Sequence, residues 1–387
     1  MKENGFVAFY DKHKISPVSQ DISDLDRHVS RRRKLYRMLG IDYRLFRGAE
    51  ILEVGAGSGH NTLFFLLIGA RVDIVEPNRT GREQMKKLFN EHNINPDQYM
   101  IYDCLIEEFE IIKQYDFVIA EGFLSGLQPE EQERIVLKLL DLTKKFGYCV
   151  VTTMSECSFF FERLRRFLGC ILVRDVTDFS EKVNLLALAF KSHLNTLKYA
   201  SRTIEDWVAD NILNPVGDEV LFNIKRCIEM VCRRGDMEVV GMSPSIIPNF
   251  GWYKDYDYCY FREILRAIPE KEHLLLSVGM KDVIRSADKN EILLRDIHKI
   301  RLLARELRGG GGDLYEIVVR FRLILRHILE ENRDLEDILY LPIKEYIDVL
   351  DKVLAGIKIT PKFVAAMPYF SRMWGRGQQY ISFIKGI

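Results

Sequence analysis

The chain has 387 residues, of which 47% are hydrophobic and 29% are charged, so it can bury a sizeable core and is not expected to be disordered. Lysine plus arginine and aspartate plus glutamate each number 56, so the formal net charge is zero. This balance disfavours nucleic acid as the main partner, because phosphate binding selects a basic surface.

The seven cysteines indicate a reducing compartment rather than a disulfide framework. Cys227 and Cys232 have the wrong spacing for a zinc knuckle, and the sequence predicts no metal site. The first residues lack the layout of a signal peptide, and no run approaches the ~20 apolar residues that span a bilayer. We therefore expect a soluble, cytoplasmic protein without a membrane span, and the sequence leaves its oligomeric state open.

Four segments are expected along the chain. Residues 1–48 form an N-terminal helical segment, and residues 49–260 form a core that includes a helical insertion at about 155–235. Residues 261–374 form a second helical insertion or subdomain, and residues 375–387 return to the core as a strand.

The N-terminal segment contains one clear helical pattern. Apolar residues recur at helical spacing from Asp21 to Leu39, and Gly40 is placed to end the helix. The basic run Arg31–Lys34 falls largely on the other face. The wider basic run Arg27–Arg37 could bind a phosphate, although such a run is more typical of a solvated helix face.

From Ala49 the sequence alternates between short β-rich runs and helical patterns. Apolar strands separated by helices predict parallel strands with helices on both faces. The sequence thus predicts an α/β fold with a doubly wound, mostly parallel, seven-stranded sheet and two helical insertions. The expected strands are Glu50–Val54, Arg71–Val75, Tyr99–Tyr102, Phe117–Ala120, Tyr148–Thr152, Met237–Gly241 and Gln379–Ile384, and the expected helices between the first five are Asn61–Leu67, Arg82–Glu91 and Glu130–Lys145.

A glycine-rich loop follows the first expected strand, in Glu53-Val54-Gly55-Ala56-Gly57-Ser58-Gly59. Glycines let the backbone turn sharply and approach a ligand, and the helix start that follows offers unpaired N–H groups. The next residues, His60-Asn61-Thr62, lack the Lys-Ser/Thr pair of a phosphate loop. A dinucleotide fingerprint is excluded as well, because His60 stands where its third glycine is required.

This loop resembles the first motif of the class I S-adenosylmethionine-dependent methyltransferases, an acidic residue followed by glycines at two-residue steps. Glu76 and Asp103, at the ends of the second and third expected strands, fit the same family, and the resemblance covers about residues 49–153. It implies that Glu76 binds both ribose hydroxyls, since one carboxylate has two acceptor oxygens, and that Asp103 contacts the adenine amino group. The alternative is a glycine-rich turn with acidic helix caps.

The resemblance implies a complete S-adenosylmethionine site, in which the backbone N–H of Cys104 faces the adenine ring. The implied cofactor-binding residues are Glu53, Gly55, Ala56, Gly57, Gly59, Glu76, Pro77, Asp103, Cys104 and Glu121.

The opening of the chain looks like a subset of these enzymes that is found among bacterial surface-polysaccharide genes. The residues that carry this likeness are Phe9-Tyr10-Asp11-Lys12-His13 and Ser16-Pro17-Val18-Ser19-Gln20-Asp21. It implies a lid-like segment that folds over the cofactor.

Methyl transfer is an in-line displacement, so the protein has to align the nucleophile and exclude water. After the fourth expected strand the chain reads Ala120-Glu121-Gly122-Phe123 and lacks the Asn/Asp-Pro-Pro-Tyr/Phe motif of enzymes that methylate amide or nucleobase amino groups. Glu121 is a candidate catalytic group or contact of the cofactor amino group. A helix cap or a solvated loop acid is an equal alternative for it.

A carbohydrate acceptor is suggested by residues of the first helical insertion. Asp206 and Asp210 share one helical face beside Trp207, which offers carboxylates for hydroxyls and an aromatic surface for a sugar ring. His193 is a candidate base, because its ordinary pKa lies near neutral pH. An ordinary amphipathic helix with exposed acids and a packed tryptophan would give the same pattern.

Three functions are therefore compatible with the sequence. The first is an S-adenosylmethionine-dependent O-methyltransferase that acts on a sugar or a sugar-linked small molecule. The second is an RNA or protein methyltransferase that docks through basic helices. The third is a non-catalytic module that binds the cofactor or assembles with partners.

Overall fold

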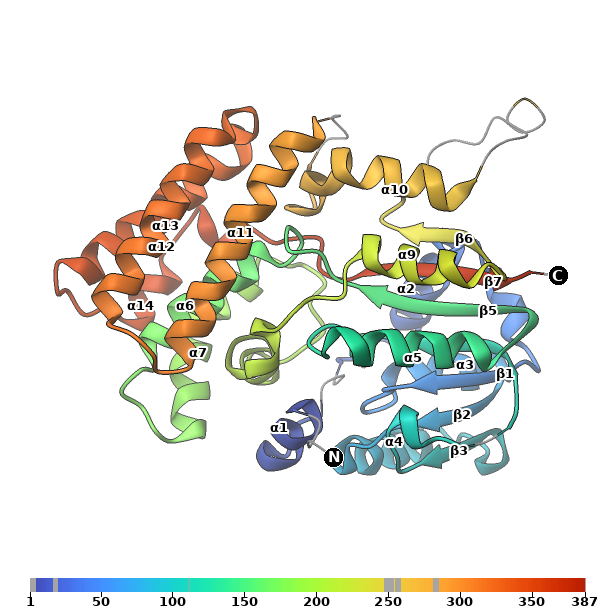
Figure 1. Ribbon diagram of the computed structural model, residues 1–387. Coiled ribbons are helices and arrows are strands. Elements are labelled where there is room, and N and C mark those ends of the chain that lie inside the picture. The colour runs from blue at the N-terminus through green and yellow to red at the C-terminus, as the bar shows by residue number, and fades with distance from the viewer. Residues whose placement is uncertain are drawn as a thin grey trace. The chain divides into compact units, whose positions relative to one another are not determined.

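The computed structural model describes residues 5–16, 20–110, 112–246, 254, 259–280 and 285–386 (Figure 1). The chain forms two compact units. The sheet unit comprises Met1–Met154, Val220–Ile268 and Gln378–Ile387, and the helical unit comprises Ser155–Glu219 and Pro269–Gly377.

Seven strands form one sheet in the order β3-β2-β1-β4-β5-β7-β6. Strands β1 to β5 pair in parallel, whereas β7 runs antiparallel to both β5 and β6 at one edge. The predicted α/β fold with a mostly parallel seven-stranded sheet is confirmed. The strands are β1 (Glu50–Val54), β2 (Arg71–Val75), β3 (Tyr99–Tyr102), β4 (Tyr115–Ala120), β5 (Thr143–Thr153), β6 (Met237–Ser243) and β7 (Gln379–Lys385).

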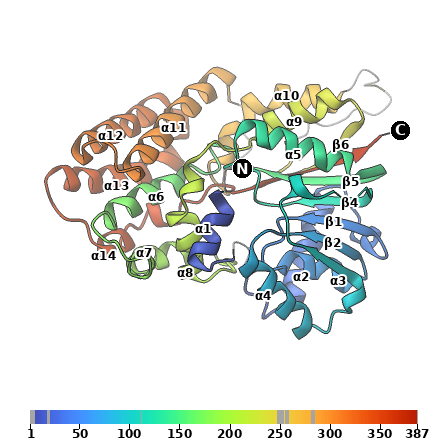
Figure 2. The ribbon, with the colours of Figure 1, turned by 60° about the horizontal axis from the view of Figure 1, so that its bottom comes forward.

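Helices cover both faces of this sheet, with α2, α3 and α4 on one face and α5 and α9 on the other (Figure 2). Several begin at a side-chain cap: Asp24 accepts a hydrogen bond from Arg27 N–H at the start of α2, and Asn78 accepts one from Gly81 N–H at the start of α4. The helices are α1 (Gly5–His13), α2 (Leu25–Met38), α3 (His60–Ile68), α4 (Arg79–Glu91), α5 (Pro129–Asp141) and α9 (Ile224–Arg234); α10 (Tyr260–Lys271) spans the end of Val220–Ile268.

The predicted boundary between α5 and β5 is wrong. The helix expected over Glu130–Lys145 ends at Asp141, and β5 begins at Thr143, because Thr143 pairs with Tyr115 of β4. The lysines that follow Thr143 suit the last turn of a helix and the first residues of a strand equally well. Pairing with β4 decides between the two structures.

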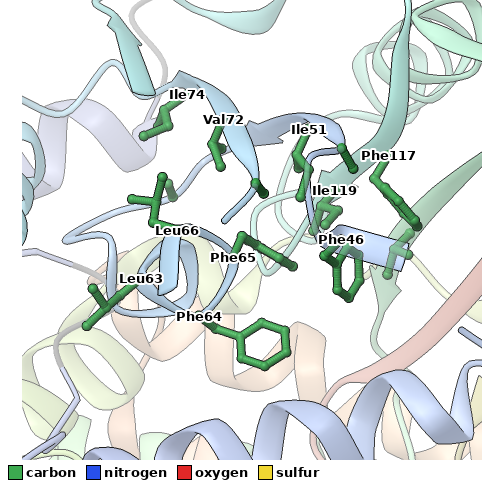
Figure 3. Packing of buried hydrophobic residues seen from close by; sticks show 14 of the residues in the cluster. Phe46, Ile51, Leu63, Phe64, Phe65, Leu66, Val72, Ile74, Phe117 and Ile119 are labelled. Carbon is green, nitrogen blue, oxygen red and sulfur yellow. The ribbon is translucent and has the colours of Figure 1, made fainter. Parts of the chain in front are cut away.

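An aromatic cluster packs α3 against the sheet (Figure 3). Phe46, Phe64 and Phe65 are fully buried, and the ring of Phe46 lies 4.6 Å from that of Phe117 in β4. Burying one such ring stabilises the fold by about 1.5–3 kcal/mol. This cluster fixes α3, which follows the glycine loop, against the sheet.

The helical unit has its own aromatic core. The rings of Phe167 in α6 and Phe321 in α12 stack at 3.8 Å, and the hydroxyl of Tyr346 in α13 donates to the carbonyl of Leu164. None of the helices in the described parts of the chain is long and apolar enough to cross a membrane. The helices of this unit are α6 (Phe160–Leu172), α7 (Phe179–Leu194), α8 (Ile204–Trp207) with a π-helix over Val208–Leu213, α11 (Ala287–Arg308), α12 (Leu314–Glu331), α13 (Glu336–Leu354) and α14 (Pro361–Ala365).

Candidate functional site

The glycine loop between β1 and α3 turns through left-handed backbone conformations. Gly57 has a φ of +55° and Gly59 a φ of +78°, values that other residues rarely adopt. A Cβ on Gly59 would also lie 2.5 Å from Cγ of Met85 in α4. Gly55 has a positive φ too, and Ala56 is buried. Backbone shape and close packing thus account for the glycines of the loop.

Glu76 follows β2, and its buried carboxylate joins the glycine loop to the start of α4. Its Oε2 accepts a hydrogen bond from Gly57 N–H at 2.6 Å, and its Oε1 accepts one from Asn78 N–H at 2.8 Å. Burial raises the pKa of Glu76, and the two backbone N–H groups act in the opposite direction. A carboxylate has about four lone-pair sites, so two remain for a ligand.

Asp103 follows β3 and is held by an arginine. Its side chain is 67% exposed and forms an ion pair with Arg82 at 2.6 Å. Arg82 also donates to the carbonyls of Glu76 and Pro77 at 2.9 and 2.6 Å. Cys104 is half-buried, and burial raises its pKa. Arg82 therefore ties together the ends of β2 and β3, where two predicted cofactor contacts lie.

Glu53 lies in β1 opposite Ile119 of β4, next to the point where the strand order reverses. It is 2% exposed, and its Oε2 has no hydrogen-bond partner among the described residues. Burial, and then the charge of Glu121, raise the pKa of Glu53 to about 7, while Arg32 opposes the shift. The hydroxyl of Thr62 lies near enough to Glu53 to lower this pKa as well. It does not have the geometry of a normal hydrogen bond to any of the described residues.

Glu121, directly after β4, accepts hydrogen bonds from four side chains. Both terminal nitrogens of Arg32 in α2 donate to it, one of them at 3.0 Å. Asn61 donates at 3.0 Å, the hydroxyl of Tyr380 in β7 at 3.2 Å and that of Tyr36 at 3.5 Å. These donors fill the lone-pair sites of the carboxylate. The structure makes Glu121 the counter-ion of Arg32, and its catalytic role stays a prediction.

The N-terminal segment contacts the loops of this site through polar side chains. Asp11 in α1 accepts a hydrogen bond from Asn78 at 2.7 Å, and Gln20 donates to Asn61 at 3.3 Å. The buried ring of His28 lies 2.9 Å from the carbonyl of His60. Part of the predicted lid motif, residues 17–19, lies outside the described residues.

His193, the candidate base, is fully buried in the helical unit. Its Nε2 lies 2.9 Å from the carbonyl of Val364, and its Nδ1 accepts a hydrogen bond from Arg165 at 3.4 Å. Burial, and then the charge of Arg165, lower the pKa of His193 to about 3. Both ring nitrogens are occupied, which is the environment of a packed histidine. A role in catalysis stays a prediction.

The residues predicted to bind a sugar also lie in the helical unit. Trp207 is buried, and its ring packs edge-on against Phe190 at 6.2 Å and Trp374 at 5.7 Å. Asp210 forms an ion pair with Arg202 at 2.7 Å, whereas Asp206 is half-buried. The ring of Trp207 therefore contributes to the core, and sugar binding by these three residues stays a prediction.

Sequence reasoning missed the side chains that organise the site. They are Arg32, Tyr36, Asn61, Asn78, Arg82 and Tyr380. A signal for the first two existed, because His28, Arg32 and Tyr36 recur every four residues and so share one helix face, which is buried. No group of three or more His, Cys, Asp or Glu side chains in the described parts of the chain could hold a metal ion.

Residues 42–161 match a family model described as Tellurite resistance protein TehB. This segment contains the glycine loop, Glu76, Asp103 and Glu121, and it is less than a third of the chain. No curated protein matches the chain.

Solved structures give distant similarities. TehB from Haemophilus influenzae is 21% identical over 29% of this chain and 38% of its own, with a TM-score of 0.26. PKMT2 from Rickettsia typhi in complex with AdoHcy is 18% identical over 61% of this chain and 48% of its own, with a TM-score of 0.43. The 1,6-didemethyltoxoflavin-N1-methyltransferase of Burkholderia thailandensis, with bound S-adenosylhomocysteine, is 20% identical over 39% of this chain and 60% of its own, with a TM-score of 0.30. The chain thus spans less than two thirds of the length of each of these structures.

Proposed function

We propose that this chain is an S-adenosylmethionine-dependent methyltransferase whose cofactor binds at the carboxyl ends of β1 to β4. The observation that carries the proposal is the Glu76 carboxylate, which is fixed by Gly57 and Asn78 and keeps lone pairs for a ligand. It stands beside a left-handed glycine loop at the edge where doubly wound sheets bind ligands. The similarity of residues 42–161 to the TehB family covers all of these positions.

The residues present fit this cofactor. Glu76 would accept the two ribose hydroxyls, and Asp103, steadied by Arg82, would accept the adenine amino group. The buried Oε2 of Glu53, unbonded within the described chain, offers an acceptor for a cationic group. Bound S-adenosylmethionine supplies an electrophilic methyl group. The part of the protein is to orient the acceptor in line with it and to exclude water.

For the acceptor we propose a hydroxyl of a sugar or of a sugar-linked small molecule. The balanced net charge and the sequence Ala120-Glu121-Gly122-Phe123 favour this class over RNA and over amide or nucleobase amino groups. A hydroxyl nucleophile needs a base. Hydrogen bonds within the described residues occupy Glu121 and both ring nitrogens of His193, so either group would have to give up a bond to act as this base.

Calorimetric titration of the chain with S-adenosylmethionine tests the cofactor. We expect binding at one site per chain and none in Gly57→Arg, because the new side chain would fill the space beside Glu76. Gly69→Arg is the matched control: Gly69 also has a positive φ, but it ends α3 at the far end of the helix and has nothing within 4 Å of a built Cβ. Absence of binding in the wild type, or equal binding in Gly57→Arg, would overturn the proposal.

Transfer of a labelled methyl group tests the acceptor. Nucleotide sugars and free oligosaccharides are compared with bulk RNA and with a protein mixture, each at the same concentration of labelled cofactor. We expect label in the sugar fractions. Label confined to RNA or to protein would replace the sugar proposal by one of those acceptors and leave the cofactor proposal standing.

A further inference from the structure

The positive charges of this chain are concentrated in one segment. Residues 27–47 contain eight of its 56 lysines and arginines but only one of its 56 aspartates and glutamates, so a chain of zero formal net charge includes a segment of +7. Of the eight cations only Arg32 is buried, where Glu121 neutralises it. The others reach the surface, and a concentration of one sign of charge there attracts partners of the opposite sign.

Helical spacing divides the last turns of α2 into a buried side and an exposed side. Tyr36 is fully buried. Arg33 and Arg37 lie four residues apart in one exposed row, and Lys34 and Met38 form a second exposed row beside it. Lys34 and Arg37 form no ion pair with any residue that the structure describes. The charges of these two side chains therefore remain available to a partner.

The 3-10 helix η1 (Tyr43–Phe46) extends this exposed side beyond the end of α2. The guanidinium of Arg33 lies 4.5 Å from the centroid of the Tyr43 ring. Hydrogen bonds from Arg44, and then the charges of Arg44 and Arg37, lower the pKa of Asp42 to about 2, so the one acid of the segment is neutralised by its neighbours. The basic patch defined in this way comprises Arg33, Lys34, Arg37, Arg44 and Arg47, with Met38 and Leu45 as its large apolar side chains.

Two large apolar side chains stand exposed among these cations. Met38 is 53% exposed and Leu45 is 51% exposed. Aliphatic side chains between arginines match an anionic membrane interface, where cations contact the lipid headgroups and apolar side chains enter the acyl boundary. A surface for single-stranded RNA instead presents aromatic rings on which bases stack, whereas the ring of Tyr43 is half-buried beside Arg33.

We propose that the basic patch docks the chain on an anionic lipid surface, with its cations at the lipid phosphates and Met38 and Leu45 inserted between them. Each lysine or arginine near such a surface strengthens binding by about fivefold. Five cations and two apolar side chains together support reversible attachment. The inference goes beyond the proposed function and is tested without the cofactor.

Sedimentation of the full chain with lipid vesicles is the first test. Vesicles of phosphatidylcholine alone are compared with vesicles in which a quarter of the lipid is phosphatidylglycerol. We expect binding to the anionic vesicles at about 0.1 M salt and loss of most of it at about 1 M salt, because the screening length falls from about 10 Å to about 3 Å. Equal binding to both kinds of vesicle, or binding to neither, would overturn the proposal.

The second test removes three cations of the patch together, in Arg33→Gln, Lys34→Gln and Arg37→Gln. All three side chains are exposed, so the buried side of α2 is left intact, and circular dichroism reports the folding of the variant. We expect the anionic vesicles to be bound about 100-fold more weakly, at about fivefold for each cation. Wild-type binding in this triple variant would contradict the role of the patch.

The matched control removes two arginines and one lysine from the other face of the sheet, in Arg134→Gln of α5 and Lys225→Gln and Arg233→Gln of α9 (Figure 2). These side chains are exposed too, and the change in net charge is the same. We expect vesicle binding within about threefold of the wild type, because screening limits the reach of a surface charge. Equal weakening in both triple variants would show that net charge alone attracts the vesicles, which would overturn the proposal.

The third test separates a lipid surface from other polyanions and keeps every charge. Met38→Ser combined with Leu45→Ser should weaken binding to the anionic vesicles by about tenfold, since two half-exposed apolar side chains no longer enter the bilayer. Binding of bulk RNA is measured beside it as the alternative. Unchanged vesicle binding in this variant, or tighter binding of RNA than of anionic vesicles by the wild type, would overturn the lipid proposal.

Discussion

Two buried arginines, Arg285 in the helical unit and Arg32 in the sheet unit, differ in how many of their side-chain nitrogens donate a hydrogen bond. Arg285 in the helical unit donates from all three: to Asp334 from Nε at 2.8 Å, to Asn290 from Nη1 at 2.7 Å and to Asn332 from Nη2. Arg32 in the sheet unit donates from both terminal nitrogens to Glu121 but keeps Nε unbonded within the described chain. Both side chains are more than nine-tenths buried.

The same contrast holds between His193 and Glu53. His193 uses both ring nitrogens to hold neighbouring segments, whereas Glu53 keeps a buried oxygen open. An unbonded buried atom alone does not mark a site, since Glu162 and Arg165 of α6 each have one and are opposite charges on one helix. What distinguishes the sheet edge is that two such atoms accompany a glycine loop and a fixed Glu76.

The largest effect, on the free energy of unfolding, is expected from breaking the buried ion pair between Arg32 and Glu121 at the carboxyl end of β4. Glu121→Ala leaves Arg32 buried without a counter-ion, and we expect it to lower the free energy of unfolding by about 3–5 kcal/mol, measured by urea denaturation. The exposed pair is the control, and Arg44→Ala should leave the unfolding midpoint unchanged. A loss below about 1 kcal/mol in Glu121→Ala would mean that Arg32 stays hydrated and is not part of a buried cluster.

The second prediction concerns pH. The folded pKa of Glu53 is raised to about 7 from its ordinary value of 4.5, so between these pH values the folded chain holds a proton that the unfolded chain has lost. Stability contributed by this group is present below about pH 4.5 and is lost as the pH rises through 7, by about 3 kcal/mol. In Glu53→Gln the free energy of unfolding should no longer fall between about pH 4.5 and pH 7, as measured by urea denaturation at several pH values. The same pH dependence in the variant and the wild type would contradict the raised pKa of Glu53.

The third prediction compares two carboxylates of the candidate site. Glu76→Gln should weaken cofactor binding by about 10- to 100-fold, because a fixed, buried anion loses its charge towards the ribose hydroxyls. Asp103→Asn should have a smaller effect, since the Asp103 side chain is 67% exposed. Calorimetric titration measures the dissociation constant of the cofactor for both variants. A larger loss in Asp103→Asn than in Glu76→Gln would contradict the binding of the ribose by Glu76.

The smallest effect on cofactor binding is expected from His193→Gln, which should leave the dissociation constant within about twofold. The pKa of His193 is lowered to about 3, so the folded chain holds it neutral while the unfolded chain protonates below about 6.5. The free energy of unfolding that this group contributes is therefore lost as the pH falls below 6.5. This pH dependence is opposite in sign to that of Glu53. Urea unfolding at several pH values should show that this slope disappears in the variant.

The sheet and the acidic positions along it were predictable because their signals are local. The first three strands have the predicted bounds, and Glu76 lies at the end of its strand as the pattern indicated. Apolar runs and glycines are read within a few residues of one another, and the carboxyl ends of parallel strands then meet at one edge.

The partners of those positions were not predictable, because they are distant in sequence. Arg32 lies 89 residues from Glu121, and Tyr380 lies 259 residues from it. The basic run Arg31–Lys34 predicts a mostly solvated helix face. This prediction is wrong for Arg32, which is buried and forms an ion pair with the buried carboxylate of Glu121. Helical spacing likewise could not tell whether Trp207 faces a ligand or the core.

A crystal structure of the chain with S-adenosylhomocysteine tests the central claim most directly. We predict density beside the glycine loop, with both ribose hydroxyls within hydrogen-bond distance of the Glu76 carboxylate. Density at another place, or a ribose bound to a different carboxylate, would contradict the account.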